Sequence, residues 1–149
     1  AKNPESAAHL QRQFAERIAK KTYIAITDGK PKLNAAKIDL PIGRNPSAPS
    51  TFRIDPNGKP AQTTYHVLAE NDTQSLVELK PTTGRTHQLR VHLAHLNAPI
   101  LGDQVYGKSS DCRMMLHAQK LEITLPSGER KVFEAAIPDE FKRFFPEDL

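Results

Sequence analysis

The sequence contains a single cysteine, Cys112, among its 149 residues. No disulfide bond can therefore form within the chain, which is typical of proteins in a reducing compartment, and we expect a cytoplasmic location. Cys112 lies between Asp111 and Arg113, with no identifiable base beside it in the sequence. Because a reactive cysteine needs surroundings that stabilise its thiolate, we expect Cys112 to be structural.

Long apolar stretches are also absent. No segment approaches the roughly 20 apolar residues that a membrane-spanning helix requires, and no signal peptide or lipidation motif is visible, so we expect no membrane partner. The sequence lacks a G-x-S-x-G nucleophile elbow as well as the G-x-x-x-x-G-K and G-x-G-x-x-G phosphate-binding motifs. These absences argue against a Ser/His/Asp hydrolase and against a nucleotide-binding enzyme built on those loops.

The composition that remains is typical of one soluble, globular domain. Hydrophobic residues make up 38% of the chain and charged residues 26%, and a chain of this length buries enough surface for a hydrophobic core. The formal net charge is +4. This mild excess of basic residues is compatible with a nucleic-acid partner, and equally with an unspecific basic surface.

The periodicity of apolar residues predicts more strands than helices. Ala7, Leu10, Phe14 and Ile18 recur at helical spacing and predict an amphipathic helix over residues 4–19. Extended segments are predicted at residues 23–27, 36–40, 51–54, 63–69, 75–80, 116–125 and 130–137, and further helices at residues 86–96 and 139–144. Because strands often follow one another directly, we predict an α+β fold with a mainly antiparallel, mixed sheet flanked by a few helices.

The segment from residue 84 to residue 107 carries the densest set of hydrogen-bonding side chains. Placed on a helix, residues 85–96 form a polar stripe beside a stripe of leucines. The polar stripe comprises Arg85, Gln88, His92 and His95, and the apolar stripe comprises Leu89, Leu93 and Leu96. We expect the leucines to pack against a sheet and the polar stripe to line the edge of a cleft.

The same segment offers groups that suit an anion. Arg90 and His87 point away from the polar stripe, where they are placed to reach phosphates. Ahead of the predicted helix lie Thr82, Thr83 and Gly84. Their free backbone N–H groups favour a negative charge at this position.

Two other readings of this pattern stay open. The first is a solvated helix face whose threonines only cap the helix. The second is a metal site built from His87, His92 and His95, since imidazoles at helical spacing are able to share one ion. No carboxylate or cysteine completes a recognisable ligand spacing for such a site.

Residues 84–92, with the sequence GRTHQLRVH, closely resemble the signature motif of the RluA family of RNA pseudouridine synthases. The resemblance continues through PILGD at residues 99–103 and YG at residues 106–107. Three more family motifs occur in the family's order, and these are K-x-Y at residues 21–23, A-x-T-x-Y at residues 61–65 and R-x-x-L-H-A at residues 113–118. The match therefore runs from residue 1 to about residue 137.

This resemblance implies a pseudouridine synthase-like fold and an RNA partner. The family converts chosen uridines in ribosomal or transfer RNA to pseudouridine, and it uses neither a metal nor an organic cofactor. An aspartate attacks the nucleotide, the glycosidic bond breaks, and the uracil turns and rejoins the ribose through carbon. Because the target base must leave its stack, such an enzyme needs an aromatic platform and a basic cleft.

The resemblance also implies roles for individual residues. Tyr23 is expected to stack on the flipped uracil, and Leu116 to line the base pocket. Arg85 is expected to form an ion pair with the catalytic aspartate and to keep that aspartate ionised. The other expected substrate contacts are Gln88, Arg90, His87, His92, Arg113 and Lys108.

One family motif is missing. The nucleophilic aspartate lies in an H-R-L-D-x-x-T-S-G segment upstream of the stretch that resembles residues 1–3, and this segment is absent. We therefore expect residues 1–149 to be a partial catalytic domain, truncated at its N-terminus, that cannot isomerise uridine alone. The alternative is a non-catalytic RNA-binding module on the same scaffold. We also expect that the apolar face of the helix predicted over residues 4–19 permits self-association.

Overall fold

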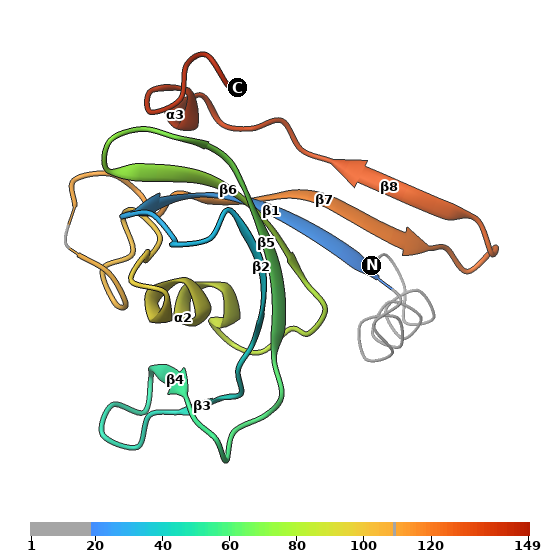
Figure 1. Cartoon of the computed structure of the whole chain (residues 1–149). Coiled ribbons are helices and arrows are strands. Elements are labelled where there is room, and N and C mark those ends of the chain that lie inside the picture. Colours follow the sequence, from blue (N-terminus) through green and yellow to red (C-terminus); the bar gives the residue numbers. More distant parts are fainter. Residues whose placement is uncertain (1–18, 109) are drawn as a thin grey trace.

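The computed structural model describes residues 19–108 and 110–149, and its centre is a six-stranded sheet (Figure 1). The strand order is β2-β5-β6-β1-β7-β8, and every neighbouring pair is antiparallel. The strands are β1 (Lys20–Asp28), β2 (Ala35–Asp39), β5 (Gln62–Glu70), β6 (Gln74–Pro81), β7 (Leu116–Thr124) and β8 (Arg130–Glu134). This arrangement confirms the predicted α+β fold with a mainly antiparallel sheet.

A small sheet and two helices complete the described part of the chain. Strand β3 (Ile42–Arg44) pairs with β4 (Phe52–Ile54) close to helix α2 (Gln88–His95), and helix α3 (Asp139–Lys142) lies near the C-terminus (Figure 1). Within residues 19–108 and 110–149, no helix is long and apolar enough to cross a lipid bilayer.

Alternate residues of β1 belong to hydrophobic cores on opposite faces of the sheet, as the period of a strand requires. Ala25 packs with Leu89 and Leu93 of α2. Its neighbour Ile24 packs with Phe141 of α3 on the other side. We call the face that bears Ala25 the α2 face and the face that bears Ile24 the α3 face. Because both faces are covered here, β1 is buried along this half of its length and holds fixed positions on each face.

The sequence pattern predicts every strand of the large sheet and β4, but it does not predict β3, which spans 3 residues. The helix predicted over residues 86–96 begins only at Gln88. The preceding residue, His87, has a φ of 56°, in the left-handed region that an α-helix excludes. The helix predicted over residues 4–19 lies almost wholly outside the described residues.

Candidate functional site

A hollow of about 230 Å³ opens on the α2 face, between β1, β7 and the loop that leads into α2. It contains most of the residues that the sequence singles out as site residues. Those that line it are Tyr23, Arg85, His87, Gln88, Arg90 and Leu116. The hollow therefore gathers side chains from segments that are far apart in the sequence.

Tyr23 and Leu116 line this hollow from the neighbouring strands β1 and β7. Tyr23 pairs with Ala118 across β1 and β7, and Ala25 pairs with Leu116. Tyr23 and Leu116 are thus diagonal neighbours on the α2 face, a separation that an aromatic ring spans. Burial raises the pKa of Tyr23, so its ring is neutral at pH 7 and presents a flat apolar surface with one hydroxyl.

Lys21 lines the same hollow one step along β1. Its side chain lies on the α2 face because it is two residues from Tyr23. Burial lowers the pKa of Lys21. In the sequence, Lys21 stands out only as the first residue of the K-x-Y motif, and that resemblance gives it no role of its own.

Arg85 lies in the loop before α2, and its side chain is held at one point. Its Nε donates a hydrogen bond of 2.8 Å to the carbonyl oxygen of Pro60. Among the described residues, no hydrogen-bond or ion-pair partner occupies its two terminal nitrogens, Nη1 and Nη2. A guanidinium held through Nε and open at its Nη groups is suited to bind a carboxylate or a phosphate.

Gln88 fixes this loop from the first turn of α2. Its Oε1 accepts hydrogen bonds from Thr83 Oγ1 at 2.6 Å and from the backbone N–H of Arg85 at 3.1 Å. Its Nε2 donates to Gln62 O and to Thr63 Oγ1, each at 2.9 Å. All four hydrogen-bonding positions of the amide are used inside the protein, and the side chain is buried.

The expectation that His92 faces a cleft is wrong. His92 is fully buried, with 0% of its surface exposed. Its Nδ1 lies 2.9 Å from Thr63 Oγ1 and its Nε2 lies 3.0 Å from the carbonyl oxygen of Leu40. Because that carbonyl only accepts, Nε2 carries the proton and Nδ1 accepts the threonine hydroxyl. The helix turns this histidine toward β5, since α2 packs on the sheet with its polar stripe partly inward.

His87 is held against two aromatic rings at the rim of the hollow. Its Nδ1 lies 2.6 Å from Tyr106 Oη, and its ring meets the rings of Phe52 and Tyr106 edge-on at 5.5 Å. Tyr106 Oη also accepts the backbone N–H of Phe52 at 2.9 Å, so the tyrosine proton is available for His87. Burial lowers the pKa of His87, with nearby Arg90 adding to this effect, and the ring is neutral at pH 7.

Arg90 is paired within the protein. Its Nε and Nη2 each donate a hydrogen bond of 2.9 Å to the carboxylate of Asp103, and its guanidinium lies over the Tyr106 ring at 5.0 Å. Asp103 also accepts the backbone N–H groups of Val105 and Tyr106. Burial alone would raise the pKa of Asp103, but these hydrogen bonds outweigh it and the pKa is lowered. The charge of Arg90 is thus matched locally.

The remaining predicted site residues lie elsewhere. Arg113 is exposed and faces Glu140, with Nη1 3.6 Å from Oε1. Lys108 is exposed beside a different hollow, lined also by Asp28 and Pro99. Neither residue lines the hollow at Tyr23, and their expected contacts with substrate stay predictions.

The metal-site reading fails for the described residues. Within residues 19–108 and 110–149, no group of three or more histidine, cysteine, aspartate or glutamate side chains is placed to hold a metal ion. His92 uses both ring nitrogens inside the protein, and His87 uses Nδ1 on Tyr106. His87 and His92 therefore hold the fold around the hollow, whereas His95 is exposed and lines a different hollow.

No carboxylate lines the hollow in the described part of the chain. All the aspartates of the sequence lie within that part, and Asp103, which contacts the lining residue Arg90, is committed to that ion pair. The hollow thus combines an aromatic ring, an apolar wall and open guanidinium nitrogens. This set suits a flat, neutral ring attached to an anionic backbone, with an acidic group still to be supplied.

Comparisons with known proteins agree on one family. Residues 1–95 match the family described as RNA pseudouridylate synthase. An uncharacterized RNA pseudouridine synthase of Zymomonas mobilis is 44% identical over 147 residues, which are 95% of this chain and 67% of the relative. The dual-specificity RNA pseudouridine synthase RluA of Escherichia coli K12 is 43% identical over 133 residues, 85% of this chain and 61% of the relative.

Two further matches extend this result. Ribosomal large subunit pseudouridine synthase D of Nitrosomonas europaea is 38% identical over 152 residues, 94% of this chain and 44% of the relative. The structure of human RNA pseudouridylate synthase domain containing 1 superposes with a TM-score of 0.82 at 37% identity, covering 95% of this chain and 63% of the human chain. The chain thus spans between 44% and 67% of the length of these curated relatives.

Proposed function

Because the chain belongs to the RNA pseudouridylate synthase family and is of the RluA type, we propose that its hollow on the α2 face receives a uracil ring of RNA for isomerisation to pseudouridine. The observation that carries this proposal is the convergence of Tyr23, Arg85 and Leu116 on one hollow. A flipped base needs a flat partner and an apolar wall, and the carboxylate that attacks the nucleotide needs a cation beside it.

Each of these residues has a defined part in the proposed reaction. Tyr23 offers its ring to the uracil and its hydroxyl to a proton of the reacting base. Leu116 closes the side of the hollow and keeps water from that face. Arg85 presents Nη1 and Nη2 to the carboxylate that attacks the nucleotide, and an ion pair there keeps the carboxylate deprotonated and aimed. Gln88 fixes the backbone of Arg85.

We infer that the nucleophile is not one of the aspartates of this sequence, and the observation in support is that none of them lines the hollow. We infer that residues 1–149 form the part of a catalytic domain that binds the base, and that an aspartate from an H-R-L-D-like segment completes it. On this proposal the chain alone binds RNA and leaves uridine unchanged. A fusion that supplies the missing segment restores the reaction.

Release of tritium from RNA that carries 5-tritiated uridine tests this directly, since carbon 5 loses its hydrogen when it bonds to the ribose. The chain alone is compared with a fusion in which the upstream segment of the Zymomonas mobilis relative precedes residue 1. We expect release from the fusion only. Release by residues 1–149 alone would show that the nucleophile lies within this sequence.

The substrate and location follow as finer proposals. We infer ribosomal or transfer RNA as the substrate, supported by a relative named for the large ribosomal subunit, and the cytoplasm as the location. Mapping pseudouridine in both RNA classes after incubation with the fusion tests the first part. Modification confined to other RNAs would contradict it.

A second candidate is a non-catalytic RNA-binding module, favoured by the absence of a carboxylate from the hollow within the described residues. The same fusion separates the two functions. A folded fusion that binds RNA without releasing tritium supports the binding module. The open Nη groups of Arg85 favour the enzyme, because they leave room for an acidic partner.

A further inference from the structure

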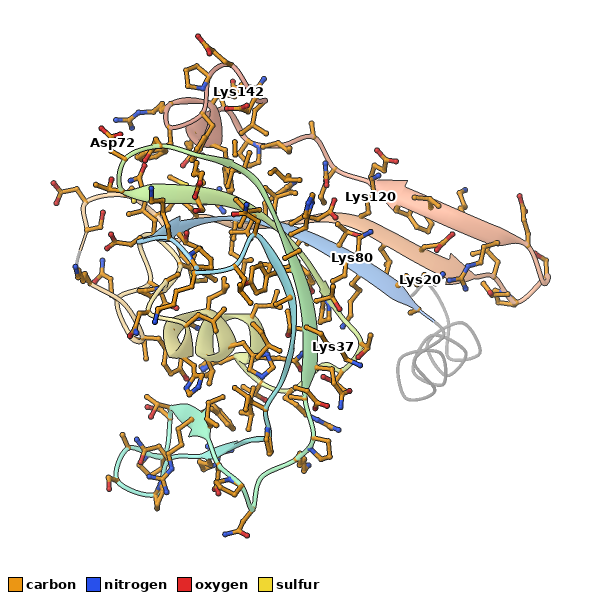
Figure 2. The ribbon with its side chains drawn as sticks, in the orientation of Figure 1. Lys20, Lys37, Asp72, Lys80, Lys120 and Lys142 are labelled. Carbon is orange, nitrogen blue, oxygen red and sulfur yellow. The ribbon has the colours of Figure 1, made fainter. Side chains whose placement is uncertain are left out.

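A row of lysines crosses the α3 face of the sheet. The antiparallel registers pair Lys37 of β2 with Thr64, Thr64 with Lys80 of β6, and Thr22 of β1 with Lys120 of β7. Tyr23 faces Leu79, which places Thr22 beside Lys80 and closes the row. We define the lysine row as Lys37, Lys80 and Lys120, with Lys20 added from the next position on β1 that shares this face. Figure 2 shows these lysines spread along the strands.

The lysine row occupies the half of its face that the C-terminal segment does not cover. The other half bears Ile24, Ile26 and Leu76, which pack under Phe141 and Phe145 of the C-terminal segment. The side chains of the row are open to solvent, with 60% of Lys80 and 46% of Lys120 exposed. The lysines therefore form a solvent-exposed charged surface that is separate from the hydrophobic core on the other half of this face.

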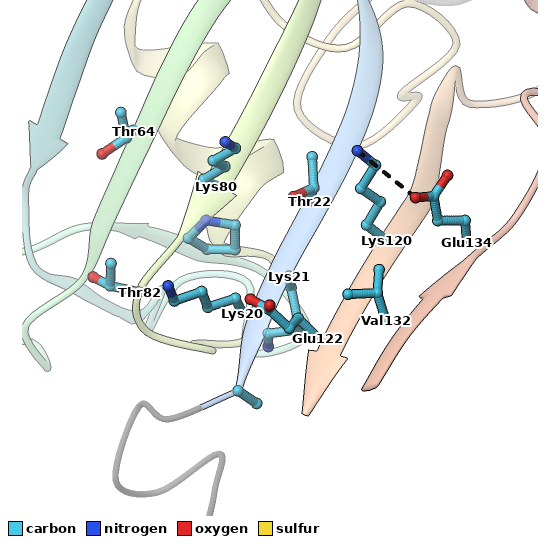
Figure 3. A pocket seen from close by; sticks show the side chains of 12 residues that line it. Lys20, Lys21, Thr22, Thr64, Lys80, Thr82, Lys120, Glu122, Val132 and Glu134 are labelled. Carbon is cyan, nitrogen blue, oxygen red and sulfur yellow. Dashed lines mark ion pairs between the residues drawn. The ribbon is translucent and has the colours of Figure 1, made fainter. Parts of the chain in front are cut away.

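A shallow hollow of about 680 Å³ lies along the row (Figure 3). It lies on the side of the strands opposite α2, and the side chains of Lys20, Lys80, Lys120, Thr22, Thr64 and Thr82 reach into it. Three threonine hydroxyls beside cations are a typical setting for phosphate contacts. Its lining residues come from β5, β6, β1, β7 and β8, so the hollow extends across neighbouring strands.

Two glutamates lie in the same hollow and must be counted against the lysines. Glu134 lies 3.9 Å from Lys120 Nζ, and Glu122 lies 3.5 Å from Arg130. Lys80 lies 3.6 Å from Glu78. Each pair is at least partly exposed to solvent and therefore weak, so a phosphate competes with it. The lining still carries more lysines than glutamates.

Lysines often protect the free edge of a sheet, but that role does not explain this row. Lys37 lies on the edge strand β2, where edge protection applies. Lys80 and Lys120 lie on β6 and β7, which are paired on both sides. Neighbouring strands are about 4.8 Å apart, so a lysine on every second strand recurs at about 10 Å. This spacing lets flexible ammonium groups follow successive parts of one polyanion.

The two hollows meet at the end of the sheet. Lys21 and Pro81 line both the hollow at Tyr23 and the hollow along the lysine row. A strand of RNA that leaves the first hollow therefore passes these two residues and reaches Lys20 and Lys80, which line the second hollow.

Resting on the proposed function of the hollow at Tyr23, we propose that the RNA strand flanking the target uridine continues around this end of the sheet and binds the lysine row through its phosphates. The occupant is single-stranded RNA backbone, read by charge and without base contacts. The row adds affinity that grows with the length of the strand beyond the flipped nucleotide, and this affinity depends strongly on salt.

Fluorescence anisotropy with two labelled single-stranded RNAs tests the proposal on the full chain. A uridine trinucleotide reaches only the hollow at Tyr23, whereas a uridine dodecamer reaches the lysine row as well. The test variant carries Lys20→Gln, Lys80→Gln and Lys120→Gln. The control carries Lys30→Gln, Lys32→Gln and Lys142→Gln, which removes the same charge from exposed positions outside the row.

We expect the test variant to bind the dodecamer more weakly than the control. The slope of log affinity against log salt should fall in magnitude by about 2 for the test variant, because each lost phosphate contact on a single strand accounts for about 0.7. Trinucleotide binding should stay equal in the two variants. A separate variant in which Lys80 and Lys120 are replaced by arginine should keep the slope of the unaltered chain, since both positive charges remain.

Equal dodecamer binding and equal slopes in the test and control variants would overturn the proposal. If the unaltered chain fails to bind the trinucleotide, the proposed function of the hollow at Tyr23 fails instead. Loss of trinucleotide binding in the test variant alone would show that the lysines act through the first hollow, which also contradicts a separate backbone track.

Discussion

The side-chain oxygen of Gln88 accepts the backbone N–H of Arg85 at 3.1 Å. This bond ties the loop that carries the arginine to the first turn of α2. The same oxygen accepts Thr83 Oγ1, and the amide nitrogen donates to Thr63 on β5. A buried amide thus connects sheet, loop and helix, and the position of the Arg85 guanidinium depends on it.

Gln88→Leu should destabilise the protein and displace Arg85. The substitution leaves buried partners of the amide unsatisfied, and each such group costs about 1–3 kcal/mol. Urea unfolding measures the loss, and trinucleotide binding measures the displacement. The matched control is Gln104→Leu on the exposed surface, for which we expect a change within about 0.5 kcal/mol. Similar losses in the two variants would contradict this role.

The buried ring of His92 should make the protein less stable in mild acid. Burial lowers the pKa of His92, and the bond to Leu40 O only partly offsets it; His95 lowers it further and Asp39 raises it. His92 therefore binds a proton near pH 6.5 in the unfolded chain and stays neutral at that pH in the folded chain. Stability is fully present above that pH and falls as the pH drops toward the folded pKa, by at most about 1.4 kcal/mol per pH unit.

Urea unfolding at pH 7.5 and pH 5.5 measures this effect. His92→Gln should flatten the difference between the two pH values while lowering stability at both. His66→Gln, at an exposed position of β5, serves as the control and should keep the difference. A pH dependence that survives in His92→Gln would assign it to another group.

Asp103→Ala should be among the most destabilising single changes in the described part of the chain. It leaves Arg90 partly buried without its partner and removes the acceptor of the Val105 and Tyr106 N–H groups. Breaking a buried pair costs about 3–5 kcal/mol. Glu134→Ala breaks an exposed pair and should cost less than about 1 kcal/mol. Thermal unfolding of both variants measures the two losses of stability. Similar losses would contradict the claim that the Arg90–Asp103 pair stabilises the fold.

Tyr23→Ala should weaken binding of the uridine trinucleotide, whereas Tyr23→Phe should preserve it. A base stacked on an aromatic ring gains about 1–3 kcal/mol, equivalent to roughly 5- to 150-fold in affinity. Anisotropy with the labelled trinucleotide measures both variants. If Tyr23→Phe loses as much affinity as Tyr23→Ala, the hydroxyl and not the ring carries the contact.

The sequence predicts strands better than it predicts the inner or outer position of polar side chains. A short apolar run identifies β1, which is buried on both faces along half of its length. Alternation identifies β5, where buried and exposed side chains alternate over the first half of the strand. The helical wheel places His92 on a polar stripe, yet the structure buries it against Thr63. A wheel shows which residues share a face, but only the packing of the helix on the sheet decides which face turns inward.

Two features of the site depend on contacts that no local pattern contains. Arg90 and Asp103 lie thirteen positions apart and pair only because the loop after α2 folds back. His87 takes a left-handed conformation, held by Tyr106 and Phe52, where periodicity predicts helix. The lysine row is likewise invisible in sequence, because its members come together only through the register of β2, β5, β6, β1 and β7.

The most direct measurement compares tritium release by two versions of the fusion that carries the upstream segment, one unaltered and one with Arg85→Gln. We expect release by the unaltered fusion and a rate of release at least about 100-fold lower in Arg85→Gln. Removal of one charged group at a transition state costs about 3 kcal/mol or more. Trinucleotide binding should change far less. Equal release by the two fusions would contradict the claim that Arg85 serves the reacting carboxylate in this hollow.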